Sequence, residues 1–357
     1  MFLFGDALRK KVFFNYEKRL RLHSPPEKIF EYFATFQSAD GEVLMKPSDL
    51  MRAVVPVFPP SESSLVRDGF LKGERSPGEL RSAPSKFFDV ANGGLISFKE
   101  YIFFVTLLAI PESCFSVAFK MFDTDNDREI NRDEFKKVMA LMRAHNRQGA
   151  SHRNGRSRGL KANGSVEDGG SLDYFFGKGG KARLHHETFI QFMKDLHDEI
   201  LRLEFAHYDY NSQGKISAKD FALSIIAAAD SSYLNELFKR VERLNSDPHL
   251  SEVRITLEEF KQFAELRDKL RPFSFALSGY GKVNGFLTRE DFKRVASHVC
   301  GVSLTDSVVE IIFNIFDKNR DGSLNIDEFV KVLHKQQRDI PQPVASGIMG
   351  FLSQYRK

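Results

Sequence analysis

The chain has 357 residues, which is enough for two or three domains, and its formal net charge is +4 at pH 7. Its two cysteines, Cys114 and Cys300, lie far apart, so a disulfide framework and a zinc site are excluded and buried thiols are expected. Phe, Leu and Ile recur at helical spacing, and no apolar run is long enough to span a membrane. This pattern predicts an all-α protein with short strands only where loops pair.

Residues 1–22 form a basic N-terminal segment in which Lys and Arg are interleaved with aromatic side chains. The basic residues of the cluster are Arg9, Lys10, Lys11, Lys18, Arg19, Arg21 and, just beyond the segment, Lys28. Such a charge run is typical either of a solvated helix face or of a surface that docks to an acidic partner or anionic lipid. No transit or signal peptide is recognisable.

A loop from Asp89 to Glu100 has the length and end residues of a calcium-binding loop. Ala91 and Gly93 replace the ligands expected at its third and fifth positions, so the pattern predicts a loop that keeps the fold but binds no ion. The short apolar run 102–108 is then the buried helix that leaves this loop.

A loop with a near-complete set of calcium ligands follows. The ligands are the side chains of Asp123, Asp125, Asp127, Asn131 and Glu134 and the carbonyl of Glu129. Arg128 occupies the sixth position, where glycine is expected, and a left-handed conformation there costs roughly 1 kcal/mol. Because four carboxylates offset that cost, we expect calcium to bind here. Ile130, at the eighth position, should pair with a partner loop.

Residues 145–171 are rich in Arg, His, Asn, Gly and Ser and read as a flexible basic loop. No aromatic or motif support accompanies this charge, so we expect no nucleic-acid partner. Farther on, His185 and His186 lack a metal-binding spacing, and 177–181 lacks the sequence of a phosphate-binding loop. Since no catalytic constellation emerges, we do not expect an enzyme.

A weaker calcium loop runs over residues 209–220. Its candidate ligands are Asp209, Asn211, Gln213, the carbonyl of Lys215, Ser217 and Asp220. Only two of these are carboxylates, and Asp220 is shorter than the usual glutamate. This composition favours weak calcium binding or the smaller Mg²⁺, and a structural loop with no ion is the alternative.

Two more stretches keep the loop pattern and lose the ligands, one around 255–260 and one over 280–291. A binding loop needs a partner whose short strand pairs with its own, and that partner does not have to bind an ion. The repeated helix–loop–helix unit is therefore the organising feature of the chain.

The best-formed loop runs over residues 317–328. Its ligands are Asp317, Asn319, Asp321, the carbonyl of Ser323, Asn325 and Glu328. Gly322 stands at the turn, and apolar residues at helical spacing flank the loop on both sides. Residues 341–357 can form an amphipathic C-terminal helix that binds a partner.

The stretches between these loops carry a more specific resemblance. Distinctive runs are YEKRLR at 16–21, PEKIFEYFAT at 26–35, GLISFKEYIFF at 94–104 and DYFFG at 173–177. Together they resemble the mitochondrial calcium uptake (MICU) family, whose members regulate the calcium uniporter channel. The loop at 209–220 resembles that of plant members, which carry an additional EF-hand.

The resemblance implies two EF-hand lobes, which we expect over 23–178 and 179–340. It also implies homo- or heterodimers in the mitochondrial intermembrane space, peripheral to the inner membrane. The uniporter pore subunit would be met by Tyr16, Arg19, Arg21 and Lys28, with anionic inner-membrane lipid as a further possible contact. The intermolecular disulfide of animal members is not expected, because no cysteine follows Cys300.

The function that follows is a calcium-sensing gatekeeper of the uniporter, which blocks or permits uptake according to the calcium occupancy of its EF-hands. Two alternatives stay open from the residues alone. One is a soluble EF-hand calcium buffer, and the other is an EF-hand adaptor that regulates an enzyme. A binding partner distinguishes them, because a buffer needs none.

Overall fold

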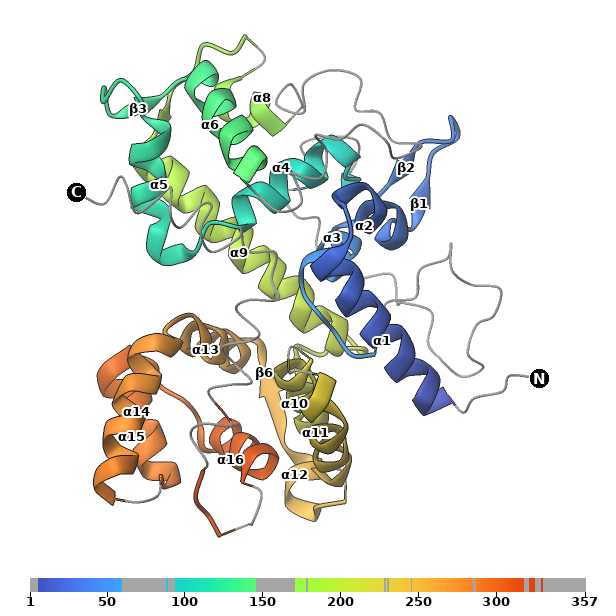
Figure 1. Cartoon of the computed structure of the whole chain (residues 1–357), viewed down its shortest axis with the longest axis vertical. Coiled ribbons are helices and arrows are strands. Elements are labelled where there is room, and N and C mark those ends of the chain that lie inside the picture. The colour runs from blue at the N-terminus through green and yellow to red at the C-terminus, as the bar shows by residue number, and fades with distance from the viewer. Residues whose placement is uncertain are drawn as a thin grey trace. The chain divides into compact units, whose positions relative to one another are not determined.

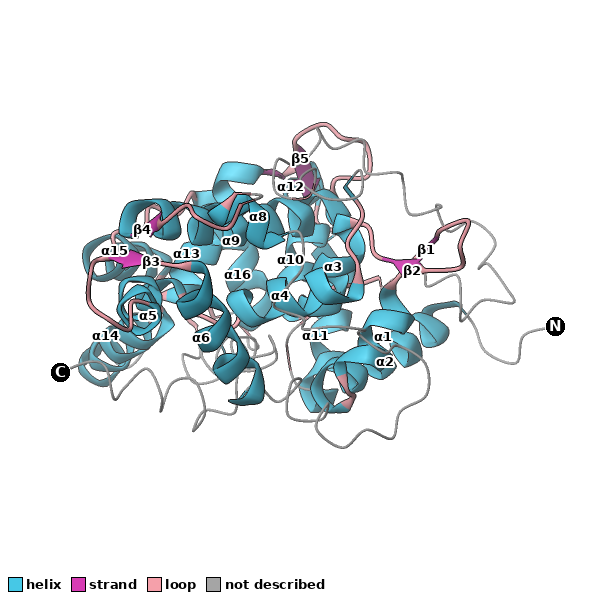
Figure 2. Cartoon of the chain, turned by 90° about the horizontal axis from the view of Figure 1, so that it is seen from above, coloured by secondary structure: helices cyan, strands magenta, loops and turns pink. Residues whose placement is uncertain are grey.

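The computed structural model describes residues 6–59, 88, 94–145, 171–177, 179–227, 229, 231–244, 246–284, 287–317, 321–324 and 329. These residues are mostly helical, and the strands among them form three two-stranded antiparallel sheets (Figures 1 and 2). The all-α EF-hand fold expected from the sequence is confirmed. The predicted C-terminal helix at 341–357 and most of the basic loop at 145–171 lie outside the described residues.

The chain divides into two compact units, and the division falls inside helix α9, between Leu203 and Glu204. The lobe boundary expected from the sequence lies earlier, between 178 and 179. The described residues before the division belong to unit 1, except for 56–59, which belong with the later residues to unit 2.

Unit 1 contains the helices that carry the N-terminal segment and the loop at 123–134. Its elements are α1 (Asp6–His23), α2 (Pro26–Phe33), β1 (Phe36–Gln37), β2 (Val43–Leu44), α3 (Pro47–Val54), α4 (Phe98–Leu108), the short 3-10 turn Glu112–Cys114, α5 (Phe115–Phe122), β3 (Glu129–Ile130), α6 (Arg132–His145), α8 (Ser171–Phe176), β4 (Leu184–His185) and the first part of α9 (His186–Tyr208).

Unit 2 contains the loops at 209–220 and 317–328. Its elements are the end of α9, β5 (Lys215–Ser217), α10 (Ala218–Ile226), α11 (Ser231–Leu244), α12 (Pro248–Glu252), β6 (Arg254–Thr256), α13 (Leu257–Asp268), α14 (Leu270–Asn284), α15 (Arg289–Cys300) and α16 (Asp306–Phe316).

The loops meet in pairs through the apolar residue at the eighth position of each loop. The contacts are the Met45–Ile96 bridge, Ile130 opposite Leu184 in β3–β4, Ile216 opposite Ile255 in β5–β6, and the Leu324 amide donating to the Leu287 carbonyl at 3.1 Å. The predicted role of Ile130 is confirmed. Pairing of this kind shields the short strands, because each strand supplies the hydrogen-bonding partners of the other.

The acid at the twelfth position caps the start of the helix that leaves the loop. It does so even in loops that lack the other calcium ligands. At the start of α4, the Ser97 amide donates to Oε2 of Glu100 at 2.8 Å, and the Glu100 amide donates back to the Ser97 hydroxyl. Thr256 and Glu259 make the same reciprocal bonds at the start of α13. This is the capping box, which satisfies amides that the helix itself leaves open.

Aromatic rings fill the space between the helices on either side of each well-formed loop. Phe122 at the end of α5 stacks on Phe135 in α6, with ring centroids 4.9 Å apart, and both side chains are fully buried. In unit 2, Phe316 at the end of α16 meets Phe329 beyond the loop at 5.1 Å. The apolar flanks seen in the sequence therefore form the core that positions the loops.

The apolar run 102–108 lies in α4, where Ile102, Phe103 and Leu107 are buried. Among the described helices, no single one is long and apolar enough to cross a membrane. Helix α4 and the segment Glu112–Phe122 meet the length and composition requirements only as a pair, and the pair is bent by 79°. The prediction that α4 is a buried exit helix is confirmed.

Candidate calcium sites

The three candidate loops share one backbone geometry, which is set by the acid at the first position. The amide at the sixth position donates to that acid in each loop: Arg128 to Asp123 at 3.1 Å, Gly214 to Asp209 at 2.7 Å, and Gly322 to Asp317 at 2.9 Å. The bond folds each loop back toward its first residue, as the backbone of a calcium loop requires.

The sixth residue is left-handed in all three loops. Its φ is +71° at Gly214, +81° at Gly322 and +72° at Arg128. The left-handed conformation expected of Arg128 is confirmed, and it carries a strain of roughly 1 kcal/mol that the two glycines do not. The loop at 123–134 therefore adopts the calcium-loop geometry despite the arginine.

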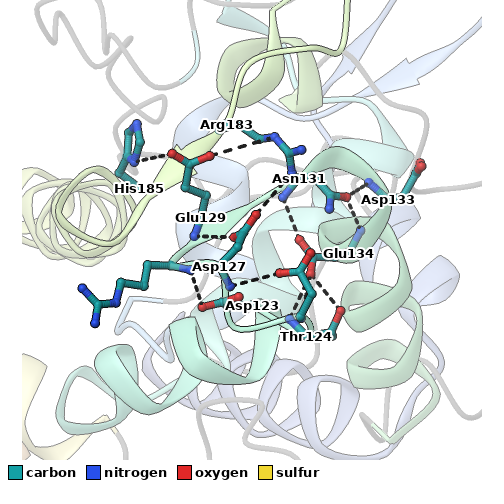
Figure 3. Close-up of polar contacts among 11 residues, drawn as sticks. Asp123, Thr124, Asp127, Glu129, Asn131, Asp133, Glu134, Arg183 and His185 are labelled. Atoms are coloured by element: carbon teal, nitrogen blue, oxygen red, sulfur yellow. Dashed lines mark hydrogen bonds and ion pairs between the residues drawn. The ribbon is translucent and has the colours of Figure 1, made fainter.

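Three acids of this loop converge on one centre, and two of them, Asp123 and Glu134, are labelled in Figure 3. The carboxylate oxygens of Asp123, Asp125 and Glu134 lie within 4.8 Å of one another, the one group of three potential metal-ligating residues found in the described part of the chain. Oδ1 of Asp123 is buried and accepts no hydrogen bond. Such an oxygen is costly unless a cation occupies the centre it faces, so the residues present fit a hard divalent ion.

The charges at this centre oppose one another in the absence of a cation. Burial, followed by the charges of Asp127 and Glu134, raises the pKa of Asp123 even though two backbone amides favour its charged form. A bound divalent cation reverses the effect of those neighbours, because it supplies the positive charge that the clustered carboxylates lack.

Glu134 closes the loop from the start of α6. Its Oε1 accepts the amide and hydroxyl of Thr124 at 3.0 and 2.8 Å and the amide of Asp125 at 3.3 Å. Its Oε2 accepts the amide of Asn131 at 2.9 Å. Burial alone would raise the pKa of Glu134, but these bonds outweigh burial and leave the pKa below its usual value.

The other predicted ligands of this loop hold its backbone. Oδ1 of Asp127 accepts the amide of Glu129 at 2.8 Å, and Oδ1 of Asn131 accepts the amides of Asp133 and Glu134, both at 3.0 Å. Asn131 is thus also the N-cap of α6. Asp127 is not part of the three-acid group, although it lies in the same loop (Figure 3).

In the loop at 209–220, carboxylate oxygens that could bind an ion already accept hydrogen bonds from the protein. Both carboxylate oxygens of Asp209 accept backbone amides, and Oδ2 of Asp220 accepts the Ser217 hydroxyl at 2.6 Å. Asn211 and Gln213 are exposed, and Lys215 lies in β5. The geometry is that of a calcium loop, but only two carboxylates are available to an ion.

At the loop 317–328 the described residues agree with the sequence pattern. Oδ1 of Asp321 accepts the amide and the hydroxyl of Ser323, as Asp127 accepts the amide of Glu129 in the earlier loop. The predicted ligands Asn319, Asn325 and Glu328 lie outside the described residues.

The predicted partner-contact residues differ in their exposure. Tyr16 is 42% exposed on α1, and Arg19 on α1 and Lys28 on α2 are also exposed. Arg21 is buried instead. Its Nη2 lies 3.1 Å from Oε2 of the buried Glu17, and its Nε donates to the Arg52 carbonyl at 2.8 Å.

Arg21 also stacks over the Phe33 ring, 5.0 Å from its centroid, and the Tyr32 hydroxyl donates to Glu17 at 3.3 Å. These contacts tie α1 to α2 and α3. The expectation that Arg21 contacts a partner therefore has to be corrected for this conformation: its guanidinium is enclosed in unit 1 and holds the basic helix in place.

Two further loops were not predicted from the sequence. Each pairs with a loop that was predicted. In the loop 38–49 the twelfth residue, Asp49, accepts the amide and hydroxyl of Thr35 and pairs with Arg52. In the loop 177–188 the eighth residue is Leu184. The sixth positions of these loops are Val43 and Ala182, so the glycine that marks such a turn is missing. An apolar residue just before a helix start was the only remaining signal.

Comparison with known proteins identifies the family and supports the assignment of these loops. The model of an EF-hand domain pair matches residues 282–333, and the model of an EF-hand domain matches 115–142. The matched segments contain the loops at 317–328 and 123–134. The fold resembles the apo structure of the mitochondrial calcium uniporter protein MICU2, with a TM-score of 0.64, 24% identity and 93% of both chains covered.

A crystal structure of EFHA2 in a calcium-binding state has a TM-score of 0.63 and 28% identity, covering 86% of this chain and 97% of that one. The human calcium uptake protein 1 is 29% identical over 96% of this chain and 73% of its own length. The mitochondrial calcium uptake protein of Arabidopsis thaliana is 65% identical over 99% of this chain and 71% of its own length. The chain belongs to the family of mitochondrial calcium uptake proteins, as its sequence led us to expect.

Proposed function

We propose that this protein is a calcium-sensing regulatory subunit of the mitochondrial calcium uniporter, and that calcium occupancy of its EF-hands controls uptake through the channel. The observation that carries the proposal is the convergence of Asp123, Asp125 and Glu134, with a buried oxygen of Asp123 that lacks a partner. The similarity to a mitochondrial calcium uptake protein along nearly the whole chain supports the link between that centre and calcium uptake.

In this proposal the protein acts in the intermembrane space as a homo- or heterodimer, peripheral to the inner membrane. The loops at 123–134 and 317–328 bind Ca²⁺ through the ligands given above, and the loop at 209–220 binds Ca²⁺ weakly or Mg²⁺. Tyr16, Arg19 and Lys28 form the contact face for acidic groups of the pore subunit, and anionic lipid is a secondary contact.

The regulatory step is a change in the helices that flank the occupied loops. When a cation draws in the carboxylates of Asp123 and Asp125, the ends of α5 and α6 that carry this loop are drawn together with them. Calcium changes the channel contact only to the extent that it binds one arrangement of these helices more tightly than the other.

The test uses Asp123→Asn together with Asp317→Asn. An asparagine oxygen can still accept the amide at the sixth position, so the loop keeps its turn while it loses the charge that attracts calcium. Mitochondrial calcium uptake should then stop responding to external calcium. The matched control, Asp133→Asn with Asp327→Asn, removes the same charge at the eleventh position of each loop, which is not a predicted ligand, and should leave the response intact. An unchanged response in the first variant would contradict the proposal.

The partner is tested separately by capture of the pore subunit with and without calcium chelator. Arg19→Glu with Lys28→Glu should abolish capture, since both side chains are exposed. If the pore subunit is not captured by the wild-type protein, the protein is a buffer or an adaptor for another target.

A further inference from the structure

The partner of the loop at 123–134 has lost its ligands and carries positive charge. The partner loop 177–188 reads GKGGKARLHHET, with one acid, Glu187, whereas the loop 123–134 contains six. The β3–β4 pairing places Glu129 opposite His185 and Ile130 opposite Leu184, so the basic strand lies directly beside the acidic loop. The partner therefore contributes charge to the calcium centre as well as a strand.

Arg183, the residue just before this strand, reaches two acids of the calcium loop (Figure 3). Nη1 of Arg183 lies 4.0 Å from Oδ2 of Asp127, and its Nε lies 4.0 Å from Oε2 of Glu129. The ring of His185 lies on the other side of the same carboxylate, with Nδ1 at 3.6 Å from Oε1 of Glu129. Asp127 is the predicted ligand at the fifth position, so Arg183 and a bound ion would both interact with its carboxylate.

We propose that Arg183 is an affinity-determining residue, an internal cation that competes with calcium for the loop at 123–134 and raises the calcium concentration needed to fill it. The inference rests on the proposed function, because it concerns the same calcium centre. The guanidinium is permanently charged, so it opposes a nearby divalent ion in every state of the protein. It also pairs with Asp127, and that pairing must weaken when Asp127 turns to the ion.

The alternative is that Arg183 strengthens calcium binding, and the sign of the change in Kd distinguishes the two effects. If Arg183 mainly held Asp127 in a position ready for calcium, its removal would weaken binding. The side chains involved are 36–45% exposed, so solvent and salt screen their interaction. The expected change in Kd is therefore modest, about two- to fivefold.

Unit 2 contains a natural control at the equivalent place. Arg254 precedes Ile255 in β6 as Arg183 precedes Leu184, and Ile255 pairs with the eighth residue of its partner loop. The guanidinium of Arg254 donates to the carbonyls of Ser251 and Val253 at 2.8 and 2.9 Å. The partner loop has glutamine and lysine at its fifth and seventh positions, so it offers no acid there.

Calcium titration calorimetry of the full chain measures the effect, in a background where Asp209→Asn and Asp317→Asn silence the other loops. Arg183→Gln should lower the Kd of the remaining site about two- to fivefold at about 0.1 M salt, and the difference should shrink in high salt. Arg183→Lys keeps the charge and should stay near wild type, as should Arg254→Gln.

An unchanged or raised Kd in Arg183→Gln would overturn the inference, provided that circular dichroism shows the helical content of the wild type. So would an equal decrease in Kd for Arg183→Lys, because the effect would then not depend on charge. If the background protein shows no calcium binding that Asp123→Asn removes, the proposed calcium site itself fails, which is a separate result.

Discussion

Replacing Arg21 by alanine should loosen α1 far more than replacing its exposed neighbour Arg19. The side chains of Arg21 and Glu17 are 2% and 0% exposed, so the variant removes one member of a buried ion pair. Losing one member of a buried ion pair typically costs about 3–5 kcal/mol. The Tyr32 hydroxyl still donates to Glu17, so we expect the lower end, about 3 kcal/mol.

The assay is native-state hydrogen exchange, read from peptides of α1, α2 and α3. It reports the local stability of these helices separately from that of the rest of the protein. A loss of about 3 kcal/mol speeds exchange of their protected amides roughly 100-fold. Arg19→Ala should change the free energy by less than about 0.5 kcal/mol, as for an ordinary surface position. Equal exchange rates in the two variants would refute the argument that Arg21 positions the helix. The double variant Glu17→Gln with Arg21→Met should recover much of the loss, since it removes both charges.

Three further predictions concern single residues. Arg128→Gly removes the left-handed strain of roughly 1 kcal/mol, which the loop carries before an ion binds, so the free energy of unfolding in urea should rise by about that amount; a lower value would contradict this. Gly322→Ala introduces the same strain at φ +81° and should lower the free energy of unfolding by a similar amount, whereas an unchanged urea-unfolding curve would argue against it. Burial lowers the pKa of His197 to about 4, and its Nε2 has no hydrogen-bond partner. As the pH falls, His197 therefore becomes protonated in the unfolded chain before it does in the folded protein. The free energy of unfolding should fall as pH drops from about 6.5 to 4, by at most about 3 kcal/mol. His197→Gln should flatten urea-unfolding stability over that window, and an identical pH profile would show that another group is responsible.

The parts of the site that depend on local spacing could be predicted from the sequence. Ligand positions in a calcium loop follow from twelve consecutive residues, so the geometry around Asp123 and the left-handed Arg128 were accessible. The helices were equally readable, because their apolar spacing is local.

The contacts between distant segments were not accessible. Arg21 is buried because the Arg52 carbonyl, in another helix, meets its guanidinium, and no local pattern reports that. Arg183 reaches Asp127 only through the register of β3 with β4. The loop at 38–49 was missed because Val43 stands where a glycine would have marked the turn.

The capping role of the twelfth residue has a practical consequence for studies of such proteins. Glu100 caps the start of α4 although its loop lacks ligands at the third and fifth positions, so an acid at this place says little about whether an ion binds. Replacing Glu134 to silence a site also removes bonds that start α6, and a lost response then has two explanations. Substitution at the first position, as in Asp123→Asn, separates them, because it leaves the helix start untouched.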